Sequence, residues 1–262
     1  MDNNKLVDET DTKVDKNKIT LKIVEPIQEE WTVYEISKRA VPDTWEKVFE
    51  NAEHELKDVS GILEQRKELY GKFYPENKNI FRAFELTRLN KVKVVIFGQD
   101  PYHSTNRDGQ PVAQGLSFSV SRTMPVPPSL KNMYIELKNC IPEFNVPNHG
   151  DLTGWARQGV LMCNSCLTVD PGMAGSHKEL WLGFIKSVID GILEVNKNCI
   201  FVLWGRKAQK INGILKGRGK TLEGAHPSPF SAKRGFFGCE HFKIINEMLI
   251  KQNKYPINWN LP

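Results

Sequence analysis

The stretch that decides the predicted fold is VKVVIF at residues 92–97, which runs directly into GQDPYH at residues 98–103. Its apolar half has the length and the β-branched side chains of a buried strand, and its polar half contains a proline, which ends the strand. Two further apolar runs, Val160 to Cys163 and Cys199 to Trp204, predict buried strands as well, and a fourth short strand is expected near Thr221 and Leu222.

Segments with helical spacing of apolar residues lie between and around these strands. They are predicted within residues 45–73, from Ser129 to Cys140, from the Ser-x-x-Glu capping box at 176–179 to about Val195, from about Lys207 to Leu215, and from about Cys239 to Lys251. Buried strands that alternate with helices indicate an α/β fold. We therefore expect a single domain with a central four-stranded parallel twisted sheet flanked by helices.

The N-terminal part of the chain has a different composition from the rest. Residues 1–42 are charged, have few apolar side chains and end at Pro42, so they are expected to be a largely disordered extension with a short ordered stretch around Trp31 to Ile36. Residues 1–60 hold 9 Lys and Arg against 15 Asp and Glu, a net charge of −6. The whole chain has 36 Lys and Arg and 31 Asp and Glu, so residues 61–262 hold 27 Lys and Arg against 16 Asp and Glu, a net charge of +11. A basic body favours a polyanionic partner.

Several classes of protein are disfavoured by the same composition. The sequence has no apolar run of about 18 residues, as a membrane-spanning helix requires, and its first residues resemble no targeting signal. Five scattered cysteines favour a reducing, intracellular setting, without deciding between cytoplasm and nucleus. Cys163 and Cys166 form a lone CxxC with no second pair, so buried thiols are favoured over a zinc site, and no metal or cofactor is expected.

The predicted strands end in polar residues of three chemical kinds. Asp100 follows the first strand, Asn164 the second, and His226 lies in the segment after the fourth. Taken singly, they could be a turn residue, a capping residue and a loop histidine. The carboxyl ends of parallel strands meet at one edge of a sheet, where ligands bind, so we expect a shared site for a polar planar ligand.

At these residues the chain resembles the uracil-DNA glycosylases typified by the bacterial and human nuclear enzymes. The resemblance runs from about residue 44 to the end, and implies that residues 43–262 are the catalytic domain. Its motifs, in order, lie at residues 98–103, 115–120, 125–129, 150–156, 161–169, 226–231 and 234–239.

The resemblance implies a DNA repair enzyme that flips uracil out of DNA and hydrolyses its glycosidic bond, leaving an abasic site. In this role Asp100 stabilises the cationic sugar and orients water, and His226 bonds the uracil oxygen where charge develops. The base would be bound by Gln99 through its main-chain amide, Tyr102 against C5, Phe118 by stacking and Asn164 at the uracil edge. Since no lysine stands in the catalytic motif, we expect no Schiff base and no strand cleavage.

The resemblance also implies the partners. Uracil-containing DNA, single- or double-stranded, would be held by Ser129, Ser228 and Ser231, with Phe230 as the wedge in the base stack. His103 and Arg234 are expected to contact DNA as well. A DNA-mimicking protein inhibitor is a further expected partner, and the protein is expected to be a monomer.

The chain departs from the family pattern at several positions. Phe230 replaces the usual Leu, Arg206 interrupts a glycine–serine loop, Val126 interrupts a proline run, and Gln114 ends a long 104–114 segment where a His is usual. Eight Lys and Arg lie within residues 205–235, where a solvated helix face is the ordinary interpretation. Three alternatives stay open: a non-catalytic DNA-binding relative, a metal-dependent phosphoesterase using Asp100, His103 and His226, and a glycosylase with a shifted base preference.

Overall fold

The computed structural model, which describes residues 26–262, has at its centre the parallel sheet that the sequence predicts. The strands are β1 (Val94–Gly98), β2 (Val160–Asn164), β3 (Ile200–Trp204) and β4 (Lys220–Gly224). Their order in the sheet is β2-β1-β3-β4, and every neighbouring pair is parallel. The predicted fold class is confirmed.

The register brings the carboxyl ends of the strands level with one another. Gly98 at the end of β1 pairs with Asn164 at the end of β2, and Trp204 pairs with Gly224 at the ends of β3 and β4. Strands β1, β2 and β3 are buried along their whole length, whereas no residue of β4 is buried. Both β2 and β4 lie at edges of the sheet, so the weak apolar signal of the fourth strand reflects its exposure and not its edge position alone.

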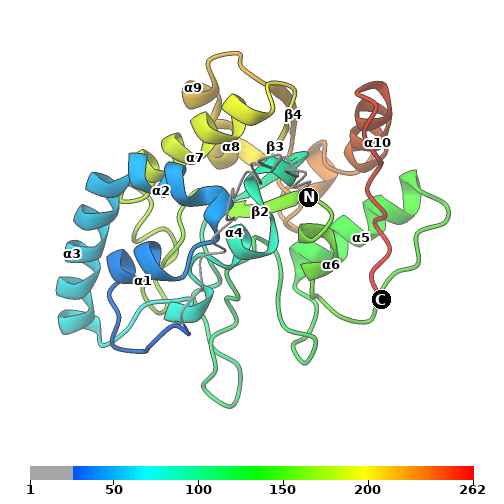
Figure 1. The fold of residues 1–262 in the computed structure, drawn as a ribbon. Helices are drawn as coiled ribbons and strands as arrows, with labels where there is room; N and C mark the ends of the chain where they lie inside the picture. The colour runs from blue at the N-terminus through cyan, green and yellow to red at the C-terminus, as the bar shows by residue number, and fades with distance from the viewer. Residues whose placement is uncertain (1–25) are drawn as a thin grey trace, which may run out of the picture.

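Helices cover the sheet on both sides. Figure 1 shows α1, α2 and α3 gathered on one side of the sheet, and α5, α6 and α10 on the other. The α-helices are α1 (Val33–Arg39), α2 (Glu46–Asn51), α3 (Glu53–Tyr70), α4 (Arg82–Leu86), α5 (Pro128–Cys140), α6 (Thr153–Ala156), α7 (Leu182–Val195), α8 (Gly205–Gln209), α9 (Asn212–Leu215) and α10 (His241–Lys251). Short 3-10 turns lie at Asp43–Trp45, Asn77–Asn79, Leu89–Lys91 and Ala232–Arg234.

Two predicted helices are interrupted in the structure. The segment within 45–73 is divided between α2 and α3 at Ala52, which is fully buried, and the segment from Lys207 to Leu215 is divided between α8 and α9. In both cases the apolar spacing is right but the chain turns between two short helices, which a periodicity argument does not detect.

The predicted helix start at Ser176 is wrong. Helix α7 begins at Leu182, six residues later, and has no side-chain cap. The Ser176 hydroxyl instead accepts a hydrogen bond of 2.9 Å from the backbone N–H of Asp170. The hydroxyl closes a loop rather than a helix, because a tertiary partner competes successfully for it.

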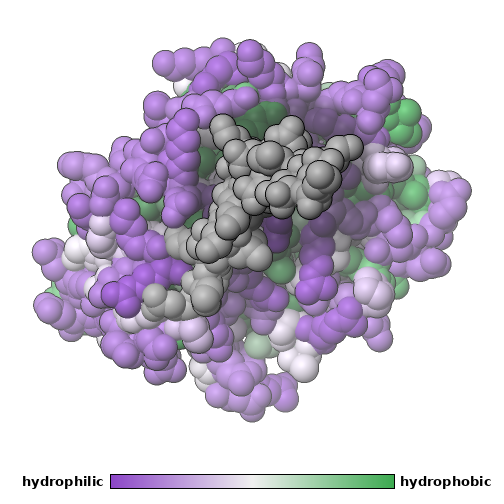
Figure 2. All heavy atoms as spheres, viewed as in Figure 1, coloured by the Kyte–Doolittle hydropathy of each residue, from purple (hydrophilic) through white to green (hydrophobic). Residues whose placement is uncertain are grey.

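The ordered stretch predicted around Trp31 to Ile36 contains the first turn of α1. Thr32 and Glu35 form a capping box there, and Val33 and Ile36 are buried in the main core beside residues of α3. The rest of the predicted extension up to residue 25 lies outside the described residues. Figure 2 shows a mainly hydrophilic face with hydrophobic residues in small patches. Within residues 26–262, no helix is long and apolar enough to cross a membrane.

Candidate active site

A cavity of about 290 Å³ lies at the carboxyl edge of the sheet, where the sequence predicts a site. Ligand sites usually measure about 300–1,000 Å³, so this one suits a small ligand. Eight of the predicted site residues line it together: Gln99, Asp100, Tyr102, His103, Phe118, Ser129, Asn164 and His226.

Asp100 lies in the loop after β1 and is held from a distant part of the chain. Its Oδ2 accepts a hydrogen bond of 2.5 Å from the backbone N–H of Gly175. Burial raises the pKa of the Asp100 carboxyl above its usual value, while the Gly175 N–H, Lys207 and His103 act in the opposite direction. The carboxylate is thus partly desolvated, which strengthens its field on a nearby cation, and is stabilised in its charged form by three groups.

Asn164 ends β2 and directs its carboxamide toward the end of β1. The close approach requires a glycine there, because a Cβ on Gly98 would lie 2.1 Å from Asn164 Oδ1 and 2.8 Å from Ser117 Cβ. Asn164 is 8% exposed, and no hydrogen bond joins its carboxamide to another group in residues 26–262. A buried, unpartnered carboxamide offers one donor and one acceptor side to a ligand.

Phe118 adopts a conformation that few non-glycine residues take. Its φ is +62°, and its ring lies 5.8 Å from the His226 ring and 6.1 Å from the Trp204 ring. Strain of this kind persists where the surroundings impose it, often at functional sites. Tyr102 donates a hydrogen bond of 3.3 Å to the Phe118 carbonyl, and burial raises the pKa of its phenol, so it is a neutral wall of the cavity.

His226 is held by a hydrogen bond to one ring nitrogen, Nδ1, which leaves Nε2 for a ligand. Its Nδ1 accepts a hydrogen bond of 3.0 Å from the Ser228 N–H, so the neutral ring carries its proton on Nε2. Burial lowers the pKa of His226, and Lys207 lowers it further, which favours that neutral form. Gly205 has a φ of +85° and passes so near that a Cβ on it would lie 2.8 Å from His226 Cβ.

Lys207 lines the same cavity and was not predicted as a site residue. On sequence alone it belongs to the solvated face of a basic helix. The structure places it instead in α8, directly after β3, and it is exposed toward the cavity and two neighbouring hollows. The catalytic motif itself contains no lysine, but the fold brings one to the cavity from a neighbouring strand end, which spacing along the chain does not reveal.

Two of the predicted DNA contacts, His103 and Ser129, line the cavity, and the other four form a second group outside it. Ser228 lines an adjacent hollow with Arg206 and Lys207, and its hydroxyl lies 2.9 Å from the Ser231 hydroxyl. Phe230 is 89% exposed and Arg234 is exposed. Of the predicted site residues, the structure thus leaves Ser228, Phe230, Ser231 and Arg234 out of the cavity.

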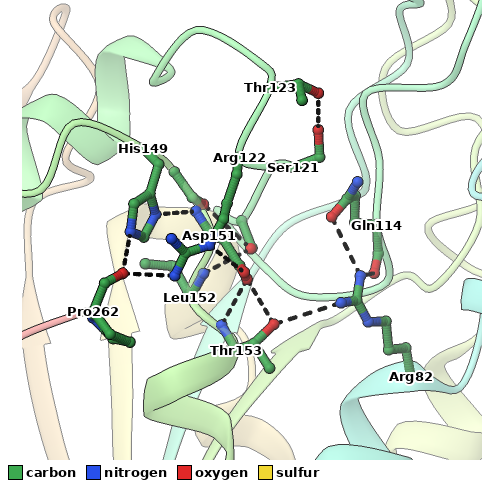
Figure 3. Close-up of polar contacts among 12 residues, drawn as sticks. Arg82, Gln114, Ser121, Arg122, Thr123, His149, Asp151, Leu152, Thr153 and Pro262 are labelled. Carbon is green, nitrogen blue, oxygen red and sulfur yellow. Dashed lines mark hydrogen bonds and ion pairs between the residues drawn. The ribbon is translucent and has the colours of Figure 1, made fainter.

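The residue at the end of the long 104–114 segment is fixed by an arginine from another element. Arg82 in α4 donates to the carbonyl oxygen and to the side-chain oxygen of Gln114, at 3.3 and 3.2 Å. Figure 3 shows how Arg82 also reaches Thr153, whose hydroxyl bonds Asp151. Gln114 lines the cavity. Gln114, which stands where the family pattern has a His, is therefore part of the cavity wall and is fixed there by hydrogen bonds from Arg82.

Metal ligation has no support in this geometry. Within the part of the chain that the structure describes, no three His, Cys, Asp or Glu side chains group closely enough to hold an ion. This includes the set Asp100, His103 and His226 that a metal-dependent phosphoesterase would use. Cys163 and Cys166 are buried and unpaired, and burial raises the pKa of both thiols to about 12.

The fold and the cavity define an α/β protein with a carboxylate, a carboxamide and a neutral imidazole around one small site. A family model described as "Uracil DNA glycosylase superfamily" matches residues 84–250. A curated uracil-DNA glycosylase of Yersinia pestis (strain Pestoides F) is 47% identical over 220 residues, which cover 82% of this chain and 94% of that protein.

Solved structures agree with this match. The crystal structure of mimivirus uracil-DNA glycosylase has a TM-score of 0.75 and 32% identity, covering 83% of this chain and 86% of the other. A mimivirus UNG variant in complex with UGI has a TM-score of 0.81 and 30% identity, covering 87% and 91%. The chain belongs to the uracil-DNA glycosylase superfamily.

Proposed function

We propose that this protein is a DNA repair enzyme that flips uracil out of DNA and hydrolyses its N-glycosidic bond, leaving an abasic site for base excision repair. The observation that carries the proposal is that Asp100, Phe118, Asn164 and His226 face one small cavity, in a chain of this superfamily. Since a base inside a duplex is out of reach, the nucleotide must be extruded first, at a cost of roughly a few kcal/mol.

The cavity selects uracil by shape and by hydrogen bonding. The base stacks on Phe118, and the unpartnered Asn164 carboxamide pairs with one donor and one acceptor on the uracil edge. Tyr102 stands where a methyl group on C5 of thymine would have to fit, so the normal base of DNA is excluded. The Gln99 main-chain amide bonds a uracil carbonyl. The carbonyl of Gln99 is already occupied by the Cys166 N–H at 3.1 Å and the Ser165 hydroxyl at 2.9 Å, which fixes the peptide.

The chemical step separates charge, and two groups act on the two ends. As the bond between C1′ and N1 breaks, uracil leaves as an anion and the Asp100 carboxylate stabilises the cationic sugar. Asp100 also orients the water that adds to C1′ and accepts the proton that this water loses. His226 donates its Nε2–H to the uracil oxygen that gains negative charge. Preorganised groups of this kind contribute about 2.7–4 kcal/mol each. The proposed mechanism requires no metal ion. We do not expect the protein to cleave the DNA strand, as a bifunctional glycosylase would.

The partner is uracil-containing DNA, held by Ser129 and His103 in the cavity lining and by the second group of residues outside it. Ser129, Ser228 and Ser231 bind phosphate oxygens, His103 and Arg234 add contacts, and Phe230 enters the gap that the base leaves. The mimivirus complex with UGI supports a protein inhibitor as a further partner. We assign these activities to residues 43–262 of a monomer that works inside the cell, in cytoplasm or nucleus.

An oligonucleotide with a single deoxyuridine, incubated with chelator and then treated with alkali, tests the proposal. We expect cleavage only after alkali, only at uracil and not at thymine, and at least about 10²-fold more slowly for Asp100→Asn. Binding without cleavage would identify a non-catalytic DNA-binding relative, and activity that chelator abolishes would identify a metal-dependent enzyme.

A further inference from the structure

The loop of residues 170–177 touches the catalytic segment at two points. Its Gly175 N–H donates to Asp100 Oδ2, and its Gly172 N–H donates to the His103 carbonyl oxygen at 2.8 Å. These residues are 75 and 69 positions apart in the chain, so the contacts exist only through the fold. Whatever fixes this loop also fixes the orientation of the Asp100 carboxylate.

A buried ion-pair network anchors the first residue of the loop. The Asp170 side chain is 1% exposed, and its Oδ2 accepts hydrogen bonds from Nε and Nη2 of Arg66 in α3, the first at 3.0 Å. Its Oδ1 lies 2.8 Å from Nε2 of the fully buried His177 at the other end of the loop. One carboxylate therefore joins both ends of the loop to a long helix.

His177 is tied into the network through both ring nitrogens. Its Nδ1 lies 2.9 Å from the Thr168 hydroxyl, which also accepts a hydrogen bond from the Trp181 indole at 2.8 Å. Its Nε2 lies 2.8 Å from Asp170 Oδ1 and 3.0 Å from Arg66 Nε, so the arginine contacts both ends of the loop. Burial lowers the pKa of His177, which favours the neutral ring. Several hydrogen bonds therefore hold the two ends of the loop together.

We propose that the loop of residues 170–177 is a clamp that orients the Asp100 carboxylate, and that Arg66, Asp170 and His177 are positioning residues for uracil excision. The inference rests on the proposed role of Asp100. The backbone of the loop supports it: the Asp170 N–H bonds Ser176 Oγ, and Gly175 has a φ of +77°, which turns its amide toward Asp100. Because the ion pairs of Asp170 hold the two ends of the loop together, the Gly175 amide is already oriented toward Asp100.

The test compares Asp170→Asn with Glu136→Gln by single-turnover excision across a range of pH. Both substitutions replace a buried carboxylate by its carboxamide, but Glu136 accepts from the Gly238 and Glu240 amides, away from the clamp. For Asp170→Asn we expect an excision rate roughly tenfold lower, because the hydrogen bond from the Gly175 N–H to the charged Asp100 carboxylate is weakened. We also expect the acid limb of the pH–rate profile, where the rate falls at low pH, to lie about one pH unit higher. Affinity for DNA with a non-cleavable deoxyuridine analogue should be unchanged.

The groups that face Asp100 are Lys207, His103 and the Cys166 thiol, with His226 across the cavity, and neither substitution alters them. An acid limb at its wild-type position in Asp170→Asn, or moved equally in Glu136→Gln, would overturn the clamp. If Asp170→Asn does not fold, Arg66→Gln replaces it, since Arg66 is 28% exposed and the His177–Asp170 contact remains. Its limb should move in the same direction by less, and an unmoved limb again overturns the proposal.

Asp100→Asn, measured in the same series, separates the two hypotheses. Full activity of Asp100→Asn would refute the proposed role of Asp100. Loss of activity there, with an unmoved acid limb in Asp170→Asn, would refute only the clamp.

Discussion

The floor of the cavity and its outer rim are built on different principles. At the floor, Gly98 and Asn164 pair across two buried strands, and the space between them is too small for one methyl group. At the rim, Phe230 and Arg234 extend into solvent from a short turn and are exposed. The comparison teaches that the proposed chemistry depends on backbone positions, whereas the proposed DNA contacts depend on side chains that the fold leaves exposed.

The strongest way to break the floor is Gly98→Ala. The added Cβ would overlap Asn164 Oδ1 and displace the carboxamide that we propose binds the uracil edge, so we expect excision to fall roughly 10²-fold or more, as misplacement by about 1 Å does elsewhere. Gly213→Ala is the control, because nothing lies within 4 Å of that position. Single-turnover rates check it, and equal rates for both variants would contradict the packing argument.

The second prediction concerns the protonation states at the floor. Asp100 must be ionised and His226 neutral; burial raises the first pKa, and burial with Lys207 lowers the second. The rate should therefore rise with pH through both pKa values and then stay level to roughly pH 9. A rate that falls as pH rises through the usual histidine pKa of 6.5 would show that the imidazolium acts instead.

Lys207→Gln sharpens the same comparison. Removal of the Lys207 cation lets the pKa values of Asp100 and His226 rise, so the acid limb of the pH–rate profile should move to higher pH by a fraction of a unit. The maximal rate at high pH should change less. Lys210→Gln is the matched control, because Lys210 lines the neighbouring groove and not the cavity.

The floor was largely predictable from the sequence. Parallel strands buried on both faces read as continuous apolar runs, and their carboxyl ends meet, so Asp100, Asn164 and His226 could be brought together without coordinates. The residues that support them were not predictable. The Gly175–Asp100 contact spans 75 positions, and neither segment carries a local sign of the other.

The same limit explains the errors. The capping-box pattern at Ser176 is local, but the hydroxyl is taken by Asp170, and α7 begins only at Leu182. Lys207 reads as a solvated lysine because helical periodicity says nothing about which cavity lies beside the first turn of α8. Local rules fail where a tertiary partner competes for the same group.

At the rim, Phe230→Ala should have an intermediate effect. Loss of the ring removes a stacking contact of about 1–3 kcal/mol, so excision from duplex DNA should fall about tenfold or more. Excision from single-stranded DNA should fall less, because no gap in a duplex has to be filled. Tyr255→Ala, which removes another highly exposed ring at 87%, should leave both rates unchanged. Equal losses on the two substrates would argue against a wedge.

The smallest expected effect is that of Arg234→Gln. A single exposed cation that contacts one phosphate contributes the release of about one counterion, so affinity should weaken on all sequences and the slope of log K against log salt should drop by about 0.9. Lys197→Gln is the control, since Lys197 is also exposed but precedes β3, at the opposite end of the strands from the cavity. The excision rate at saturating enzyme should stay at the wild-type value, because Arg234 does not line the cavity. An unchanged salt slope would remove Arg234 from the DNA-binding face and leave the rim to the serine hydroxyls and Phe230.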